Sequence, residues 1–278
     1  QDPEEVTMIF DELDSLTSGA FAALKGEIDN YYTKRYGIPA ENLMPWHYQN
    51  RYFQEAPEIY SVDFDSYYAD KDPVKLAASY YESIGLPVEA ILARSDLYEK
   101  PGKNQHAFST DLDREGDVRT LDNIRPDSYW MNTILHELGH GVYSYYNDRT
   151  LPFAVRDAAH TFTTEAVANY FGRLATNPAW MSYMGIITPD EAERISDEAF
   201  NAFRLQQLVF SRWAQVMYRF EKAMYENPDQ DLNQLWWDIV QKYQMMKKPE
   251  GRNMPDWATK IHIALYPCYY HNYLLGEL

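Results

Sequence analysis

Two histidines four residues apart carry the most specific chemistry in this sequence. His136 and His140 enclose Glu137 in the segment His-Glu-Leu-Gly-His. On a helix, residues four apart share a face, so both imidazoles can bind one metal ion, while Glu137 lies about 100° around the axis from His136 and can reach a bound water. The pattern is typical of a Zn²⁺ site that keeps one position open for water. It predicts peptide hydrolysis with the histidines as ligands and Glu137 as general base.

The alternative is that both histidines pack in the core without a metal. Two inward polar rings beside a charged glutamate would be costly to bury, and Gly139 between them weakens the helix. These costs favour the metal site.

A third protein ligand is needed, and Glu165 is the best candidate. It lies in the next helical segment, which begins near Thr161 and stops near Asn177-Pro178, after a connection suited to an antiparallel helix pair. His160 is the competing ligand, but it precedes the threonines that can cap the helix and is expected in a loop. A plain first-turn acid that favours the helix dipole is the other interpretation of Glu165.

The elements that must position these residues are helices. Asp127 or Ser128 can cap a helix that continues to about Asn147 through apolar residues at three- and four-residue spacing. Residues 105–112 and 117–122 are expected to form a short hairpin. Further helices are predicted over 4–35 (as one or two), 73–85, 188–226 and 231–247. The predicted fold is therefore mainly α: long packed helices with a short antiparallel β hairpin beside a zinc-binding helix pair, in one domain over residues 1–278.

The motif with Glu165, 25 residues beyond His140, resembles the angiotensin-converting enzyme family of zinc peptidyl-dipeptidases. The related thimet-type oligopeptidases share this arrangement. The likeness extends from residues 38–43 through 81–86 and 97–101 to the C-terminal tyrosines. It implies one Zn²⁺ per chain, bound by His136, His140 and Glu165, with Glu137 as the base.

The resemblance also implies roles for five residues outside the motif. His106 would hydrogen-bond the substrate backbone, and an edge strand beside it is what an extended peptide needs for pairing. Lys260 and Tyr270 would hold the terminal carboxylate of the substrate, and His262 and Tyr273 would stabilise the tetrahedral intermediate. The tyrosine register is open by one residue, and packing is the alternative for the tyrosine cluster.

Three departures from the family pattern limit these implications. Asn169 stands where the family has an aspartate that orients a ligand histidine. Asn169 would contact that histidine without the negative charge of the aspartate. Asn272 stands where the animal enzymes have an arginine that binds an activating chloride. The residue on which chloride activation depends in those enzymes is therefore replaced here. The family is also longer at both ends, with an N-terminal lid half and a C-terminal extension, so the chain is expected to be a catalytic-core fragment or one segment of a larger molecule.

The amino-acid composition limits the classes of molecule that this protein is expected to bind. A net charge of −17 argues against binding to nucleic acid or anionic membranes. No apolar run is long enough to span a bilayer, and the single cysteine, Cys268, excludes an internal disulfide. The compartment stays open, although the resemblance alone favours secretion or the periplasm.

The expected activity is release of C-terminal dipeptides from oligopeptides with a free C-terminus. The alternatives are a thimet-like oligoendopeptidase and a catalytically silent homologue that binds zinc or peptides.

Overall fold

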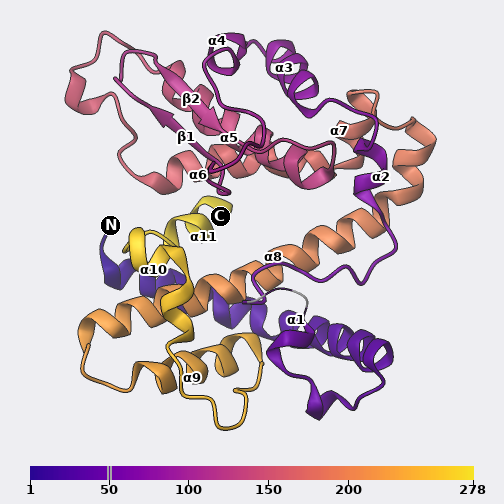
Figure 1. The fold of residues 1–278 in the computed structure, drawn as a ribbon, viewed down its shortest axis with the longest axis vertical. Coiled ribbons are helices and arrows are strands. Elements are labelled where there is room, and N and C mark those ends of the chain that lie inside the picture. Colours follow the sequence, from indigo (N-terminus) through magenta and orange to yellow (C-terminus); the bar gives the residue numbers. More distant parts are fainter. Residues whose placement is uncertain (49, 51) are drawn as a thin grey trace. The chain divides into compact units, whose positions relative to one another are not determined.

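The computed structural model describes residues 1–48, 50 and 52–278 of the chain, and helices dominate them. Two compact units are present, one formed by residues 1–61 and 200–274 and the other by residues 62–199 and 275–278. Within the described residues, no helix combines the length and the apolar character that crossing a bilayer would need. The mainly α fold with one short hairpin is confirmed (Figure 1). The assignment of residues 1–278 to one catalytic region stays a prediction.

The first unit is built on α1 (Pro3–Tyr36), the part of α8 (Pro189–Glu226) from residue 200 onward, and α9 (Leu232–Gln244). Asp2 caps α1 by accepting the Glu4 amide, and Gly37 ends it in a left-handed conformation with φ of 67°. The aromatic rings of Trp213, Phe220 and Trp236 pack together and join α8 to α9.

Shorter elements complete the first unit. They are the 3-10 turns Ala40–Asn42, Pro45–His47 and Asp256–Thr259, helix α10 (Ile261–Leu265), and the first part of α11 (His271–Glu277).

The second unit contains the hairpin and the helices around it. In chain order these are α2 (Phe64–Tyr68), α3 (Pro73–Ser83), α4 (Glu89–Leu92), β1 (Phe108–Asp111), β2 (Val118–Leu121), α5 (Ser128–Tyr145), the 3-10 turn Phe153–Val155, α6 (Thr161–Gly172), the 3-10 turn Arg173–Thr176, α7 (Pro178–Tyr183) and the start of α8. Its buried core includes Tyr81, Ile91, Ile134 and Leu138. The Tyr81 hydroxyl donates to the Leu135 carbonyl at 2.7 Å, which fixes α3 against α5.

Helices α5 and α6 form the central pair of this unit, and the hairpin packs against α5 (Figure 1). Asp127 caps α5, since its carboxylate accepts the Trp130 amide at 2.7 Å. The Asn132 side chain in turn donates to the Gly172 carbonyl at 2.9 Å, which ties α5 to the end of α6. These contacts hold α5 and α6 in a fixed position relative to each other, so side chains from both helices can converge on one point.

The hairpin is shorter than predicted. Its antiparallel register pairs Phe108 with Leu121 and Asp111 with Val118, so each strand has four residues instead of the predicted eight and six. The main loss is at the start of the first strand, where residues 105–107 are unpaired, while at the loop end the carboxylates of Asp111 and Asp113 accept backbone amides of the connecting loop.

Candidate metal centre

Three side chains from α5 and α6 bring their donor atoms together. His136 and His140 project from α5, and Glu165 projects from the second turn of α6. The two Nε2 atoms lie 3.2 Å apart, and the Glu165 Oε2 atom is 3.6 Å from each. This is the one group of three potential metal ligands found in the described part of the chain. The predicted ligands therefore converge on a common point.

The size of this triangle fits zinc. Ligand atoms about 2.0 to 2.2 Å from a tetrahedral Zn²⁺ lie roughly 3.3 to 3.6 Å from one another. The three observed separations of 3.2, 3.6 and 3.6 Å match that expectation within a few tenths of an ångström. Two nitrogens and one carboxylate oxygen are also a donor set that zinc accepts while leaving a fourth position open.

Two glycines let the helices approach closely enough to form the triangle. A Cβ atom at Gly139 would lie 2.8 Å from the Ala168 Cα, closer than any real side chain allows. A Cβ atom at Gly172 would lie 3.3 Å from the His136 Cβ. Gly139 was interpreted from sequence as a weak point in the helix. Its position against α6 gives it a packing role, because a larger residue would push Glu165 away from the histidines.

The histidines have the protonation state that a metal ligand needs. Burial and the neighbouring His140 ring lower the pKa of His136 to about 3, and burial lowers the pKa of His140 to about 4. Both imidazoles are therefore neutral at pH 7, with nitrogen lone pairs available for a cation.

Glu137 is buried beside two other carboxylates. Burial, together with the charges of Asp122 and Glu165, raises the pKa of Glu137 well above its usual value. Asp122 is itself fully buried at the end of β2, and its Oδ2 atom accepts a hydrogen bond from the Thr120 hydroxyl. A buried carboxylate next to the motif was not predicted, since nothing in the local sequence indicates that Asp122 turns inward.

His160 and Asn169 lie near the ligand helix but outside the triangle. His160 precedes the first residue of α6, as expected, and its ring stacks on Phe162 with centroids 5.5 Å apart. Among the described residues, the Asn169 side chain has no hydrogen bond to either ligand ring, whereas its carbonyl accepts from Arg173 Nε. The orienting role of Asn169 stays a prediction.

His106 is exposed, two residues before β1, and its amide donates to the Asn104 side chain at 3.0 Å. The far side of β2 is occupied by Asp96, which bridges to Leu121. Within the described residues β1 pairs with β2 alone, and the substrate-binding role of His106 stays a prediction.

The remaining predicted site residues gather in the first unit. Lys260 is buried and donates to the Gln54 side chain at 2.6 Å, with its ammonium 5.3 to 5.6 Å from the ring centroids of Tyr52, Trp213 and Tyr270. Burial lowers the pKa of Lys260 to about 8, partly opposed by the charge of Glu55. The lysine is therefore a cation at pH 7 in a mostly aromatic environment.

His262 contacts both predicted tyrosines. Its Nε2 atom is 3.2 Å from the Tyr273 hydroxyl, and its ring centroid is 4.9 Å from that of Tyr270. The Tyr270 hydroxyl also accepts a hydrogen bond from the Trp213 indole. Lys260, His262, Tyr270 and Tyr273 are thus one cluster, although their roles stay predictions.

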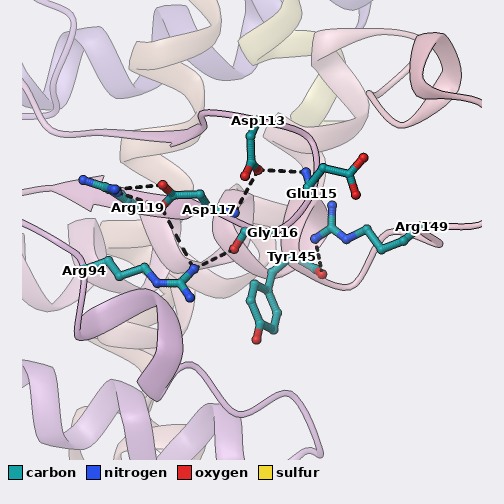
Figure 2. Close-up of a pocket in the computed structure, with 8 residues that line it drawn as sticks. All are labelled: Arg94, Asp113, Glu115, Gly116, Asp117, Arg119, Tyr145 and Arg149. Atoms are coloured by element: carbon teal, nitrogen blue, oxygen red, sulfur yellow. Dashed lines mark hydrogen bonds and ion pairs between the residues drawn. The ribbon is translucent and has the colours of Figure 1, made fainter.

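A separate concave region lies at the hairpin loop. This pocket of about 670 Å³ is lined by charged side chains that pair with their neighbours: Arg119 with Asp117, and Arg94 with the Gly116 carbonyl (Figure 2). None of the predicted site residues lines it. The pocket is therefore distinct from the metal centre.

Sequence comparison agrees with the chemistry of the site. A family model described as angiotensin-converting enzyme matches residues 53–276. The inactive angiotensin-converting enzyme-related protein of Caenorhabditis elegans is 28% identical over 229 residues, which are 75% of this chain and 24% of that protein. Angiotensin-converting enzyme of Rattus norvegicus is 24% identical over 199 residues, 68% of this chain and 15% of the enzyme. The enzyme of Bos taurus is 21% identical over 287 residues, 94% of this chain and 22% of the enzyme.

The chain spans less than a quarter of the length of each of these relatives. The family is zinc-dependent, and His136, His140 and Glu165 form a cluster that could hold a metal ion. The match of the family model over most of the sequence shows that this chain belongs to the angiotensin-converting enzyme family.

Proposed function

We propose that this chain is a zinc metallopeptidase that removes dipeptides from the C-terminus of oligopeptides. The observation that carries the proposal is the triangle formed by His136, His140 and Glu165, with Glu137 buried beside it. Family membership supports the same chemistry. Because the chain covers only part of its relatives, its own activity needs a direct test.

The three ligand residues would hold one Zn²⁺ and leave room for water and substrate. The chemistry that zinc supplies at such a site is polarisation of the peptide carbonyl and an increase in the acidity of water. The neutral imidazoles and the Glu165 carboxylate are suited to bind it without prior loss of a proton from either ring.

Glu137 would act as the general base and then as the general acid. Its carboxylate accepts a proton from the attacking water and returns it to the leaving amine. Burial and the charges of Asp122 and Glu165 disfavour the ionised form that a base requires, and a Zn²⁺ held by the three ligands would supply the positive charge that favours it. Such proton transfer contributes about 10²- to 10⁴-fold to the rate.

The substrate roles follow from the resemblance and from the chemistry of each residue. His106 would align the substrate backbone beside β1. Lys260 and Tyr270 would bind the terminal carboxylate, because a desolvated ammonium interacts strongly with an anion. His262 and Tyr273 would stabilise the oxyanion, and their hydrogen-bonded pairing supports a joint role.

Glu137→Gln tests the proposal. The variant keeps the shape of the side chain but cannot accept the proton, so it should retain one zinc per chain while peptide turnover falls about 10²- to 10⁴-fold. Glu193→Gln, at an exposed position of α8, is the matched control and should keep full activity. A Glu137→Gln protein that cleaves peptides at the original rate would exclude this mechanism.

A second candidate is a catalytically silent protein that binds zinc or peptides. The similarity to an inactive relative favours it, as does Asn169 in place of the family's aspartate. Zinc-loaded protein that captures peptides but leaves them intact, also when supplied with the rest of a longer chain, would support this candidate. Internal cleavage of amidated and free peptides at equal rates would instead indicate an oligoendopeptidase.

A further inference from the structure

The end of α11 presses on the residue that carries the metal-binding carboxylate. A Cβ atom at Gly276 would lie 2.9 Å from the Glu165 Cβ, 2.9 Å from the Ala166 amide nitrogen and 3.1 Å from the Glu165 carbonyl carbon. Residues 165, 166 and 276 all belong to the second unit. Only a glycine fits at this contact, because real Cβ atoms do not approach other atoms so closely.

An ion pair holds Glu277, the residue after Gly276, to the C-terminal end of α6. The Arg173 guanidinium donates to Glu277 Oε2 at 3.0 Å, and the Arg173 Nε atom donates to the Asn169 carbonyl at 3.2 Å. Arg173 directly follows α6. Gly276 and Glu277 therefore contact α6 near its start and at its end, so this short segment can fix the helix along its length.

Helix α6 is also held from the side of α5. Gly139 contacts the Ala168 backbone, and Gly172 lies against His136 and Asn132. These contacts set the distance between the two helices. The Gly276 contact differs from them because it acts directly on the backbone and Cβ of Glu165, the ligand that α5 does not supply.

We propose that Gly276 and the Glu277–Arg173 ion pair are positioning residues for the metal centre. They hold Glu165 where its carboxylate oxygen is 3.6 Å from both histidine nitrogens. The inference rests on the proposed zinc function, since it assigns to this segment the placement of one zinc ligand. Groups outside the ligand set that orient a ligand typically contribute 10- to 100-fold to metal affinity.

Gly276→Ala tests the proposal through zinc affinity, measured by competition with a chromophoric chelator. The added methyl group should displace the start of α6 and weaken zinc binding roughly 10- to 100-fold. The visible absorption of the Co²⁺-substituted protein should change as well, because the ligand geometry around the ion changes. Gly19→Ala is the matched control: it adds the same methyl group at a helical position with no atom within 4 Å, and should leave affinity and spectrum unchanged.

A double-mutant cycle separates positioning from general destabilisation. If Gly276 acts through Glu165, then Gly276→Ala should have no further effect on zinc affinity in a Glu165→Ala background. A merely structural effect would weaken zinc binding equally in both backgrounds, which would overturn the proposal. Ile195→Ala, in the buried core of the second unit, should lower the unfolding temperature without changing zinc affinity.

Glu277→Gln keeps the proposal testable if Gly276→Ala does not fold. Removing the charge from this partly exposed pair should weaken zinc binding roughly two- to fivefold. Wild-type protein that binds no zinc would refute the proposed function itself. Wild-type protein that binds zinc, together with folded Gly276→Ala or Glu277→Gln of unchanged affinity and Co²⁺ spectrum, would refute the positioning role alone.

Discussion

Gly139 and Ala168 approach so closely that a Cβ atom on the glycine would lie 2.8 Å from the alanine Cα. This contact joins the helix that carries both histidines to the helix that carries Glu165. It makes the metal centre dependent on a residue with no functional group.

Gly139→Ala should therefore destabilise the protein, although alanine is the better helix former. The clash costs about 1 to 3 kcal/mol, which exceeds the gain of up to about 1 kcal/mol in helix propensity. Gly26→Ala, an exposed position of α1 with open space around it, should instead stabilise the chain by about 0.5 to 1 kcal/mol. Urea unfolding of both variants measures the difference. Equal effects of the two substitutions would mean that the α5–α6 contact is looser than described.

Asp122 should make stability depend on pH. Burial raises its pKa from 3.8 to about 6, with the Thr120 hydrogen bond and the Lys103 charge acting in the opposite direction. Because the folded state binds this proton more tightly than the unfolded state, the stabilising contribution is complete below about pH 4 and is lost as pH rises through about 6.

Replacing Asp122 with Asn removes this contribution. The difference in free energy of unfolding, wild type minus Asp122→Asn, should increase by about 2 kcal/mol between pH 7 and pH 4. Taking the difference cancels the titration of groups that do not interact with Asp122, whereas Glu137, whose pKa the Asp122 charge raises, adds to the difference in the same direction. Urea denaturation at several pH values provides the measurement, and a pH-independent difference would show that Asp122 does not titrate as described.

Lys260 should determine selectivity for a free C-terminus. Lys260→Met removes the cation but keeps most of the side-chain length, so kcat/KM for a free-acid peptide should fall toward that for the amidated peptide. The effect should be about tenfold or more, since a desolvated charge-assisted hydrogen bond contributes roughly 1.5 to 3 kcal/mol. Lys242→Met, exposed in α9, serves as the control.

The pH profile gives a second measurement on the same lysine. With a pKa of about 8, Lys260 loses its charge as pH rises, so the preference for free over amidated peptides should decline above pH 8. A preference that is constant from pH 7 to pH 9 would contradict the role of Lys260.

The sequence was sufficient to predict the elements that carry periodic and capping signals. The helix bearing His136 was predicted because Asp127 caps it and apolar residues recur along it, and the boundaries of α1, α3 and α8 agree within a few residues. Helices as short as α2 or α10, with five residues, contain too little periodicity to be recognised. The convergence of Glu165 with both histidines followed from the motif and the expected helix pair.

What the sequence could not predict depends on contacts between distant segments. Gly276 lies 111 residues after Glu165, and no local pattern indicates that the two touch. Asp122 has an ordinary strand-end setting in the sequence, yet it is fully buried beside Glu137. From helix propensity alone, Gly139 was interpreted as a residue that weakens its helix. The close contact with Ala168 explains why this position needs a residue without a side chain.

The central claim is that His136, His140 and Glu165 bind one zinc ion. Zinc K-edge X-ray absorption of protein loaded to equilibrium and then dialysed tests it most directly. The account predicts one zinc per chain, with two imidazole nitrogens and oxygen ligands at about 2.0 to 2.2 Å, and the loss of an oxygen ligand or of zinc itself in Glu165→Ala. Protein that retains no zinc, or zinc whose spectrum lacks the scattering of two imidazole rings, would contradict it.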